Sequence, residues 1–404
     1  MKPQSFMLIA GEASGDLLAA ELVSALLAAS KPSEDGRVTQ FFGAGGAKMA
    51  AAGVELAFDL TQHSVIGISD VLENYFKFRR LFHQLLALAI ERKPDVVIGV
   101  DYSGFNLRFG HAVKEYVRNN PFSKWNPKIV QFVSPQVWAS RPGRANLLAA
   151  DYDLLLSIFP FEKDWYAQRV PNLRVEFVGH PMLDRSQKSE VRSQNKNPVP
   201  TILFLPGSRE SELRRHIPIF YETALMIKTT NRAVRFFMVL PNSKLADLAK
   251  VIWDSKWTGS HIAFDEEVKK MGRVIRIQTG NLSDALAEAD VAIASTGTVT
   301  MECAFFGLPT VTLYKTSRLT YQIARRIITV KSLTMPNLLA GETVYPEFVQ
   351  HDATPENISR AALELLQDES RRTKIKSQLA KIISSLGEPG AAGRAATAIL
   401  SLFP

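Results

Sequence analysis

A carboxylate directly follows an apolar segment in the stretch DVVIGVDYSGFN, residues 95–106. The run from Val96 to Val100 is typical of a strand buried on both faces, and Asp101 comes next. In open α/β sheets ligands bind beyond the carboxyl ends of the strands, so an acid there can accept a proton from a substrate. The alternative is a helix N-cap or a turn aspartate, which position alone does not exclude.

A glycine-containing loop, GEASGD at residues 11–16, joins the first apolar run to the first helical pattern. Gly15 allows close backbone approach, and Ser14 or Asp16 can cap the helix. A substrate hydroxyl or phosphate placed over this helix start would contact Ser14, Gly15 and Asp16. The loop is neither G-x-G-x-x-G nor followed by a Walker lysine, which argues against a dinucleotide fold or a P-loop. On its own, a tight turn explains it as well.

An arginine at the start of a helix marks the stretch LPGSRESELRRHIP, residues 205–218. Gly207 and Ser208 form the turn, and Arg209 lies where the helix dipole is positive, which is locally unfavourable. An anion between them would remove that cost, because a guanidinium and backbone N–H groups together bind a diphosphate. The alternative is an ion pair between Arg209 and Glu210, Glu212 or an acid elsewhere.

Hydroxyl groups and a glycine follow the strand-like run DVAIAS in the stretch ASTGTVTMECAFFGLP, residues 294–309. Thr296, Gly297 and Thr298 can hold a pyrophosphate through hydroxyl and N–H groups. Glu302 lies one helical turn after Thr298 among apolar neighbours, so its carboxylate needs a partner. Ribose hydroxyls would supply one; the alternative is a capped helix with a surface glutamate.

Aromatic and basic residues alternate in the helical pattern GISDVLENYFKFRR, residues 67–80. Its apolar positions suit either contact with an anionic membrane and acyl chains or an ordinary core helix. The positions assigned to the membrane surface are Ile68, Val71, Leu72, Tyr75 and Phe76. No metal site is predicted, because the D-x-D at residues 151–153 opens an apolar run with no histidine cluster or further acids nearby.

Apolar strand-like runs alternate with amphipathic helical stretches along almost the whole chain, which predicts parallel sheets covered by helices on both faces. The polar, proline-bearing stretch near residues 185–200 is typical of a linker between two domains. The predicted fold class is therefore α/β, with two doubly wound, Rossmann-like domains facing a cleft. The first spans residues 1–190 and the second residues 191–404, with the last helix either packing back or swapping between subunits.

The composition favours a folded protein with anionic partners. The chain has 404 residues, a formal net charge of +8 and a single cysteine, Cys303. One cysteine excludes an internal disulfide framework and points to a reducing compartment. The basic residues are scattered and lack zinc-finger spacing, so phosphates or anionic lipid head groups are expected rather than nucleic acid. No run is long enough for a membrane-spanning helix, and the N-terminal apolar run is too short for a secretory signal.

Taken in order, the motifs resemble those of the lipid-A-disaccharide synthases, inverting glycosyltransferases of the two-domain GT-B type. The resemblance covers nearly the whole chain, and its most specific series is GEASGD, SPQVW, PFEK, GHPM and PNLLAG. Three departures are visible. One is mild, because the family's SGT is Thr296-Gly297-Thr298 here and keeps the hydroxyl group. The family's D-x-P-D-F-N reads Asp101-Tyr102-Ser103-Gly104-Phe105-Asn106 here, without the proline and the second acid, and SPSVWAWR reads SPQVWASR.

The resemblance implies transfer from UDP-2,3-diacylglucosamine to 2,3-diacylglucosamine 1-phosphate through a β-1,6 bond, with release of UDP, as a step of lipid A and lipopolysaccharide biosynthesis. It implies Asp101 as the base, Arg209 as a second essential residue and no cofactor. The donor UDP would contact Gly207, Ser208, Thr296, Gly297, Thr298, Glu302 and Asn337.

The resemblance further implies a cytoplasmic enzyme held peripherally on the inner membrane of a Gram-negative-type bacterium, with a homodimer among the assemblies it allows. Two other functions stay open from the residues. One is a GT-B-fold UDP-sugar 2-epimerase, which shares the UDP site. The other is a non-catalytic lipid-binding homologue, since the Asp101 loop is altered.

Overall fold

The computed structural model describes residues 5–30, 38–63, 71–186, 199–258 and 275–403. These fall into two compact units of α/β structure. Unit 1 comprises residues 1–184 together with residues 386–404, and unit 2 comprises residues 185–385. The chain thus leaves unit 1 after Asp184, just before the polar stretch that the sequence marks as a linker, and its last helix returns to unit 1.

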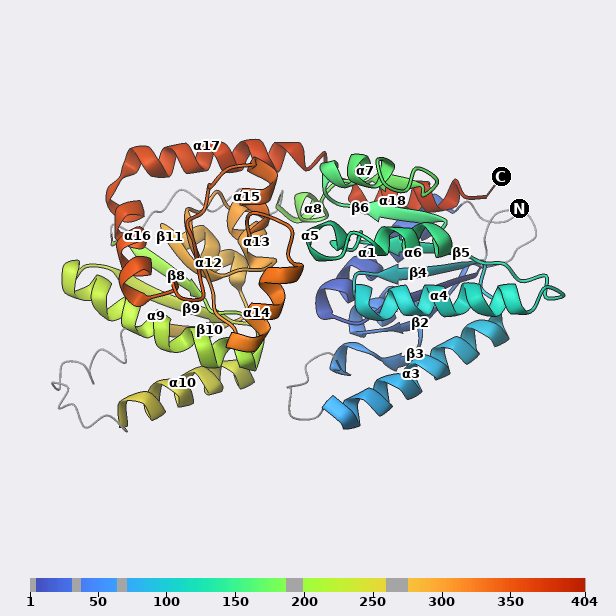
Figure 1. Ribbon diagram of the computed structural model, residues 1–404, viewed down its shortest axis with the longest axis horizontal. Helices are drawn as coiled ribbons and strands as arrows, with labels where there is room; N and C mark the ends of the chain where they lie inside the picture. The colour runs from blue at the N-terminus through green and yellow to red at the C-terminus, as the bar shows by residue number, and fades with distance from the viewer. Residues whose placement is uncertain (1–4, 31–37, 64–70, 187–198, 259–274, 404) are drawn as a thin grey trace. The chain divides into compact units, whose positions relative to one another are not determined.

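Unit 1 is built on a parallel sheet of seven strands in the order β3-β2-β1-β4-β5-β6-β7 (Figure 1). The strands are β1 (Ser5–Ala10), β2 (Gln40–Gly45), β3 (Glu55–Asp59), β4 (Val96–Val100), β5 (Lys128–Phe132), β6 (Leu154–Ser157) and β7 (Val175–Phe177). The helices are α1 (Ala13–Ala29), α2 (Ala47–Ala51), the short 3₁₀ turn η1 (Thr61–His63), α3 (Val71–Arg92), α4 (Ser103–Asn119), α5 (Val137–Ser140), α6 (Arg144–Asp151), α7 (Pro160–Ala167), α8 (Met182–Ser186, which crosses the boundary) and α18 (Ala391–Leu400).

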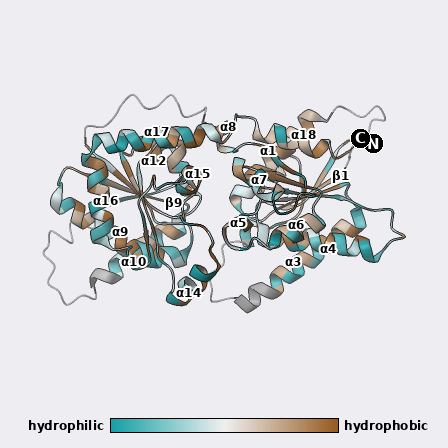
Figure 2. Cartoon of the chain, turned by 45° about the horizontal axis from the view of Figure 1, so that its top comes forward, coloured by the Kyte–Doolittle hydropathy of each residue, from teal (hydrophilic) through white to brown (hydrophobic). Residues whose placement is uncertain are grey.

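Alternate residues of β1 enter two separate cores, as the period of a strand requires. Phe6 and Leu8 pack with α1 and α18, whereas Met7 and Ile9 pack with residues of α3, α4 and α6. Both faces of the sheet are therefore covered, which agrees with the uninterrupted apolar runs of the strands. Figure 2 shows this as apolar colour concentrated on the strands.

Unit 2 holds a parallel sheet of six strands in the order β10-β9-β8-β11-β12-β13. The strands are β8 (Thr201–Leu205), β9 (Arg235–Leu240), β10 (Ile275–Thr279), β11 (Val291–Ser295), β12 (Thr310–Tyr314) and β13 (Glu347–Val349). The helices are α9 (Glu210–Thr230), α10 (Ser243–Thr258), α12 (Leu282–Glu288), α13 (Val299–Phe305), α14 (Arg318–Ile327), α15 (Met335–Ala340), α16 (Pro355–Gln367) and α17 (Glu369–Ser385).

Each sheet has one point at which the direction of winding reverses, and ligands of open α/β folds bind beyond the strand ends at that point. In unit 1 it lies between β1 and β4, where Ala10 is the register partner of Val100. In unit 2 it lies between β8 and β11, where Leu205 is the partner of Ala294. The loops that leave these four strands are the four loops that the sequence singled out.

Candidate active site

The backbone at Asp101 is held in an uncommon conformation. Asp101 and Tyr102 both have positive φ, 51° and 42°, a region that costs free energy for residues other than glycine. The carbonyl oxygen of Asp101 accepts hydrogen bonds from Asn106 Nδ2 at 2.9 Å and from Gln131 Nε2 at 2.8 Å. Its N–H donates to the carbonyl of Phe132. The surroundings thus fix the loop although its sequence offers no glycine at these two positions.

The carboxyl group of Asp101 is partly buried at the end of β4 and not sealed in the core. Burial raises the pKa of Asp101, and the negative charge of Glu12 raises it further, while a hydrogen bond from the Tyr102 N–H acts in the opposite direction. A carboxylate with a raised pKa is a stronger proton acceptor than an ordinary surface aspartate. Asp101 therefore has the properties of a general base.

The glycine loop packs directly beneath Asp101. A Cβ atom on Gly15 would lie 3.3 Å from the Val100 carbonyl oxygen and 3.6 Å from Cβ of Asp101, and one on Gly11 would lie 2.3 Å from the ring of Tyr102. Both glycines are therefore needed for the close approach of the two loops. Ser14 and Glu12 are exposed beside them.

Asp16 was predicted to contact substrate, but its carboxylate already accepts hydrogen bonds from other residues of unit 1. Its buried carboxylate accepts hydrogen bonds from the N–H groups of Gly46 at 2.8 Å, Lys48 at 3.0 Å and Met49 at 3.0 Å. These N–H groups belong to the first turn of α2 and have no partner within that helix. The side chain of Asp16 thus caps α2 and links it to α1.

In unit 2, Arg209 is the N-cap residue of α9 and its side chain is 74% exposed. The nearest acid among the described residues is Glu212, with 3.8 Å between the Arg209 Nη1 and Glu212 Oε1 atoms. Glu210 instead pairs with Lys244 at 2.9 Å. The ion pair that the sequence left open is therefore a loose, exposed contact, which contributes little.

The turn before Arg209 is shaped by backbone conformation and by Glu212. Gly207 has a φ of 120°, which favours glycine. Oε2 of Glu212 accepts a hydrogen bond from the Ser208 N–H at 3.1 Å. Glu212 thus caps the start of α9, and the guanidinium group of Arg209 stays accessible.

The loop after β11 lies next to this turn, because β8 and β11 are neighbours. Gly297 and Thr298 are exposed and Thr296 is half-buried, and Gly297 has a φ of 150°. The Thr296 N–H donates to the Leu313 carbonyl at 3.0 Å, and the Thr300 hydroxyl donates to the Gly297 carbonyl at 2.7 Å. The loop is anchored at both ends and exposes polar groups between them.

Glu302 lies on α13 one turn after Thr298. Burial raises the pKa of Glu302, an effect that the positive charge of Arg185 partly offsets. The carboxyl group is thus in a region of low dielectric constant, as its apolar sequence neighbours indicate.

Asn337, predicted as a donor contact, has its amide group engaged within unit 2. Its Nδ2 donates to the Tyr345 carbonyl and to Glu347 Oε1, both at 2.8 Å. Its Oδ1 accepts from the N–H groups of Val344 and Tyr345, both at 2.8 Å. Asn337 is buried and fixes the turn between α15 and β13.

His216 is a residue of this region to which the sequence analysis assigned no role. It is buried, with Nδ1 2.8 Å from the Pro206 carbonyl oxygen and Nε2 3.1 Å from the Lys315 N–H. Burial lowers the pKa of His216, while its contact with the Pro206 carbonyl oxygen acts in the opposite direction. It ties the Arg209 turn to the end of β12. Its position on the apolar face of α9, with Leu213, Ile217 and Phe220, is the signal that reveals it.

Most of the predicted membrane-facing positions fall outside what the structure describes. Ile68 lies outside the described residues, and Val71, Leu72 and Tyr75 are described only as backbone of α3. Phe76 is 61% exposed. Within the described ranges, no helix has both the length and the apolar character needed to cross a bilayer. In the same ranges, no group of three or more His, Cys, Asp or Glu side chains is arranged to hold a metal ion.

Comparison with known proteins assigns the chain to a protein family. A family model described as lipid-A-disaccharide synthetase matches residues 6–400. The lipid-A-disaccharide synthase of Syntrophus aciditrophicus is 34% identical over 409 residues, covering 100% of this chain and 99% of the relative. That of Myxococcus xanthus is 33% identical over 408 residues, covering 100% and 98%.

Solved structures share the fold at low identity. A Staphylococcus aureus MnaA–UDP co-structure aligns with a TM-score of 0.61 and 16% identity, covering 100% of this chain and 98% of that one. Acinetobacter baumannii MurG aligns with a TM-score of 0.53 and 15% identity, covering 99% and 100%. The predicted α/β two-domain fold is confirmed.

Proposed function

Because this chain belongs to the lipid-A-disaccharide synthetase family, we propose that Asp101 is the general base and Arg209 the diphosphate-binding residue of its glycosyl transfer. The enzyme is a UDP-sugar glycosyltransferase that forms the lipid A disaccharide. The observation that carries the proposal is the position of Asp101 at the reversal point of the first sheet, on a strained loop and with a raised pKa. Strained backbone and perturbed pKa values both concentrate at functional sites.

The chemistry assigned to Asp101 is the removal of one proton. The 6-hydroxyl oxygen of 2,3-diacylglucosamine 1-phosphate attacks the anomeric carbon of UDP-2,3-diacylglucosamine, and its proton passes to the Asp101 carboxylate. A new carbon–oxygen bond forms as the bond to UDP breaks, and the electron pair of that bond leaves on the diphosphate. Attack opposite to UDP inverts the anomeric carbon and gives the β-1,6 linkage.

The diphosphate gains negative charge as its bond to the sugar breaks. Arg209 meets this need, because its guanidinium group is exposed and has only a loose contact with Glu212. The polar groups of Thr296, Gly297 and Thr298 stand on the neighbouring loop and serve the same phosphates. Glu302, one turn further on, is assigned to the ribose hydroxyls, which would give its half-buried carboxyl group hydrogen-bond partners.

The remaining predicted donor and substrate contacts are assigned according to which of their hydrogen-bonding groups are not already used within the fold. Ser14 and Gly15 line the loop beside Asp101, and the exposed hydroxyl of Ser14 is the group offered to substrate. Gly207 presents its backbone to the diphosphate, whereas the Ser208 N–H already donates to Glu212, so the hydroxyl of Ser208 is the group assigned to the phosphates. For Asp16 and Asn337 we propose a supporting role, since their side chains already hold α2 and the turn before β13.

Peripheral contact with an anionic membrane is part of the proposal, since both substrates carry acyl chains. Two exposed apolar features support it. Phe76 lies near the start of α3. On α14 no residue is buried, and its apolar residues Leu319, Ile323 and Ile327 are spaced four apart and 72%, 50% and 36% exposed. Arg325 and Arg326 in the last turn of α14 supply the positive charge that anionic head groups attract.

The test supplies purified enzyme with UDP-2,3-diacylglucosamine and 2,3-diacylglucosamine 1-phosphate and analyses the lipids by mass spectrometry. A disaccharide 1-phosphate formed together with an equal amount of UDP supports the proposal. Reactions without acceptor serve as the control. A 2-epimerase would convert a UDP-sugar without acceptor, and a non-catalytic lipid-binding protein would release no UDP; either outcome contradicts the proposal.

A further inference from the structure

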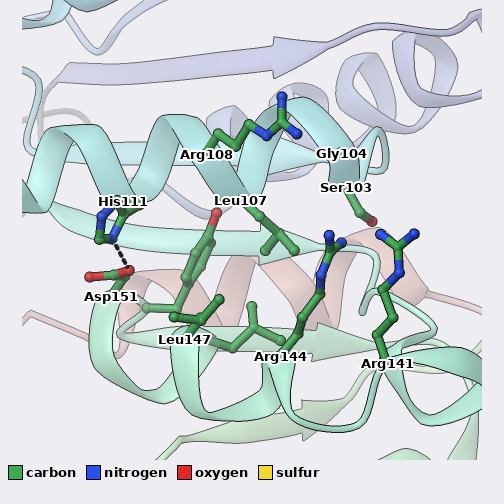
Figure 3. A pocket seen from close by; sticks show the side chains of 11 residues that line it. Ser103, Gly104, Leu107, Arg108, His111, Arg141, Arg144, Leu147 and Asp151 are labelled. Carbon is green, nitrogen blue, oxygen red and sulfur yellow. Dashed lines mark hydrogen bonds and ion pairs between the residues drawn. The ribbon is translucent and has the colours of Figure 1, made fainter.

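A cavity of about 380 Å³ lies in unit 1 beside the Asp101 loop (Figure 3). One wall comes from the first turns of α4, where Ser103 and Gly104 follow Asp101 by two and three residues. The opposite wall comes from Arg141 and from α6. The cavity is formed by unit 1 alone, and the mechanism above leaves it unused.

Three arginines line this cavity, Arg108, Arg141 and Arg144. Arg108 comes from α4, while Arg141 and Arg144 reach toward α4 from the opposite wall. In the parts of the chain that the structure describes, none of the three has an acidic partner within ion-pair distance. Such a concentration of like charge attracts an anion.

The one acidic residue in the lining, Asp151, already has charged or polar partners. Oδ2 of Asp151 contacts His111 Nδ1 at 2.8 Å, and its Oδ1 contacts Arg118 at 2.8 Å, from outside the cavity. Asp151 therefore does not compensate the three arginines. Burial lowers the pKa of Arg144, and the positive charges of Arg141 and Arg108 lower it further, so Arg144 is repelled by both neighbours. A bound anion would relieve that repulsion.

Apolar residues form much of the rest of the lining. Leu107, Leu147 and Leu148 contribute aliphatic surface, and Tyr152 contributes an aromatic side chain. The Tyr152 hydroxyl donates to the Asn106 carbonyl at 2.8 Å, and a Cβ on Gly110 would lie 2.6 Å from the same hydroxyl. These contacts fix the wall of α4 against the opposite side. A ligand that fits both the arginines and the apolar part of the lining would carry a phosphate group next to aliphatic or sugar carbon atoms.

We propose that this cavity is the subsite for the phosphate monoester of the lipid acceptor. The proposal rests on the proposed function, in which the acceptor is a glucosamine 1-phosphate whose 6-hydroxyl meets Asp101. In that molecule the attacking hydroxyl is on C6, which is bonded to C5, and the phosphate is on C1. C5 and C1 flank the ring oxygen, so one sugar ring carries both groups within its own width. Ser103 is two residues from Asp101, which spans at most about 7 Å of chain, so one sugar ring can bridge base and cavity.

The test uses the double variant Arg141→Gln/Arg144→Gln in the full-length enzyme. Both side chains reach solvent, so the substitution leaves the fold intact. The KM for the phosphorylated acceptor should rise on the order of 10- to 100-fold, because charge-assisted hydrogen bonds to phosphate are lost. The KM for the UDP-sugar donor should not change. Arg169→Gln is the matched control, since it removes an exposed arginine of unit 1 outside the cavity.

A second acceptor identifies the group that is recognised. The wild-type enzyme should prefer the acceptor with its 1-phosphate over the same lipid without it, and the double variant should use both equally. An unchanged acceptor KM overturns the proposal, as does an equal loss with both acceptors. Reduced binding to vesicles containing phosphatidylglycerol, with an unchanged KM for acceptor in detergent, would assign the cavity to a membrane head group instead. If the wild-type enzyme forms no disaccharide, the proposed function itself fails.

Discussion

Replacing Asp101 by asparagine isolates the proton-accepting role of this residue. Asparagine has nearly the same shape, and it is one of the few residues that tolerate the left-handed backbone found here. The hydrogen bonds from Asn106 and Gln131 go to the backbone carbonyl of residue 101, so the substitution leaves them in place. The variant therefore changes the chemistry of one side chain in an otherwise preserved loop.

The expected loss follows from this geometry. A positioned general base contributes roughly 100- to 10,000-fold to the rate. Since each tenfold step corresponds to about 1.36 kcal/mol, the barrier should rise by about 3–5 kcal/mol. UDP affinity should be unchanged, because the residues assigned to the diphosphate lie in unit 2.

The raised pKa of Asp101 predicts a second effect of the same substitution: the stability of the variant should increase although its activity falls. A buried carboxyl group with a raised pKa disfavours the folded state increasingly as the pH rises from its unfolded value through its folded value. Asparagine removes this charge, so the Tm of the variant relative to wild type should increase over that range and then level off. Glu12→Gln should move the acidic limb of the wild-type rate profile to lower pH, because Glu12 raises the pKa of Asp101.

The assay is disaccharide formation under saturating substrates, with UDP binding measured by calorimetry. Asp164→Asn is the control, an exposed aspartate on α7 of the same unit. A wild-type rate for Asp101→Asn would remove this residue as the base. An equal loss for both variants would mean that the effect is general to unit 1.

Three further predictions concern separate regions. Arg209→Ala should weaken UDP binding by roughly tenfold or more and slow transfer, with Arg232→Ala as the exposed control; calorimetric UDP affinity equal to wild type would contradict the diphosphate role. Burial raises the pKa of Glu162 to about 7 from 4.5, so wild type should lose roughly 3 kcal/mol of stability relative to Glu162→Gln between about pH 4.5 and pH 7.5. Urea unfolding across that range measures the difference, and parallel curves would refute it. Serine at Leu319, Ile323 and Ile327 should reduce co-sedimentation with anionic vesicles by roughly tenfold or more, and unchanged partitioning would exclude α14 from membrane contact.

The fold and the position of the candidate site followed from the sequence because both depend on local patterns. Alternating apolar runs and helical stretches predict two parallel sheets, and the loops after β1, β4, β8 and β11 carried the polar residues. The conformation at Asp101 was not predictable in the same way. Aspartate adopts positive φ more often than most residues but tyrosine does not, and the partners that hold the loop lie 5 and 30 residues further along the chain.

The roles of side chains whose hydrogen-bond partners are distant in the sequence were also not predictable from local patterns. Asp16 looked available for substrate, but its carboxylate caps a helix that begins 31 residues later. Asn337 matched a motif, yet its amide bonds to the turn that follows α15. The arginine-lined cavity was missed because Arg108 is separated from Arg141 and Arg144 by an intervening strand, β5, so no cluster appears in the sequence.

The return of α18 to unit 1 has a consequence for how the protein is made. Ala395, Ala396 and Ile399 of this helix complete the core formed by α1 and the first strand. During synthesis that apolar surface stays uncovered until the ribosome has translated all of unit 2. Premature termination anywhere in the second half would therefore release a product whose amino-terminal half is also incomplete, which makes truncated chains targets for chaperones and proteases.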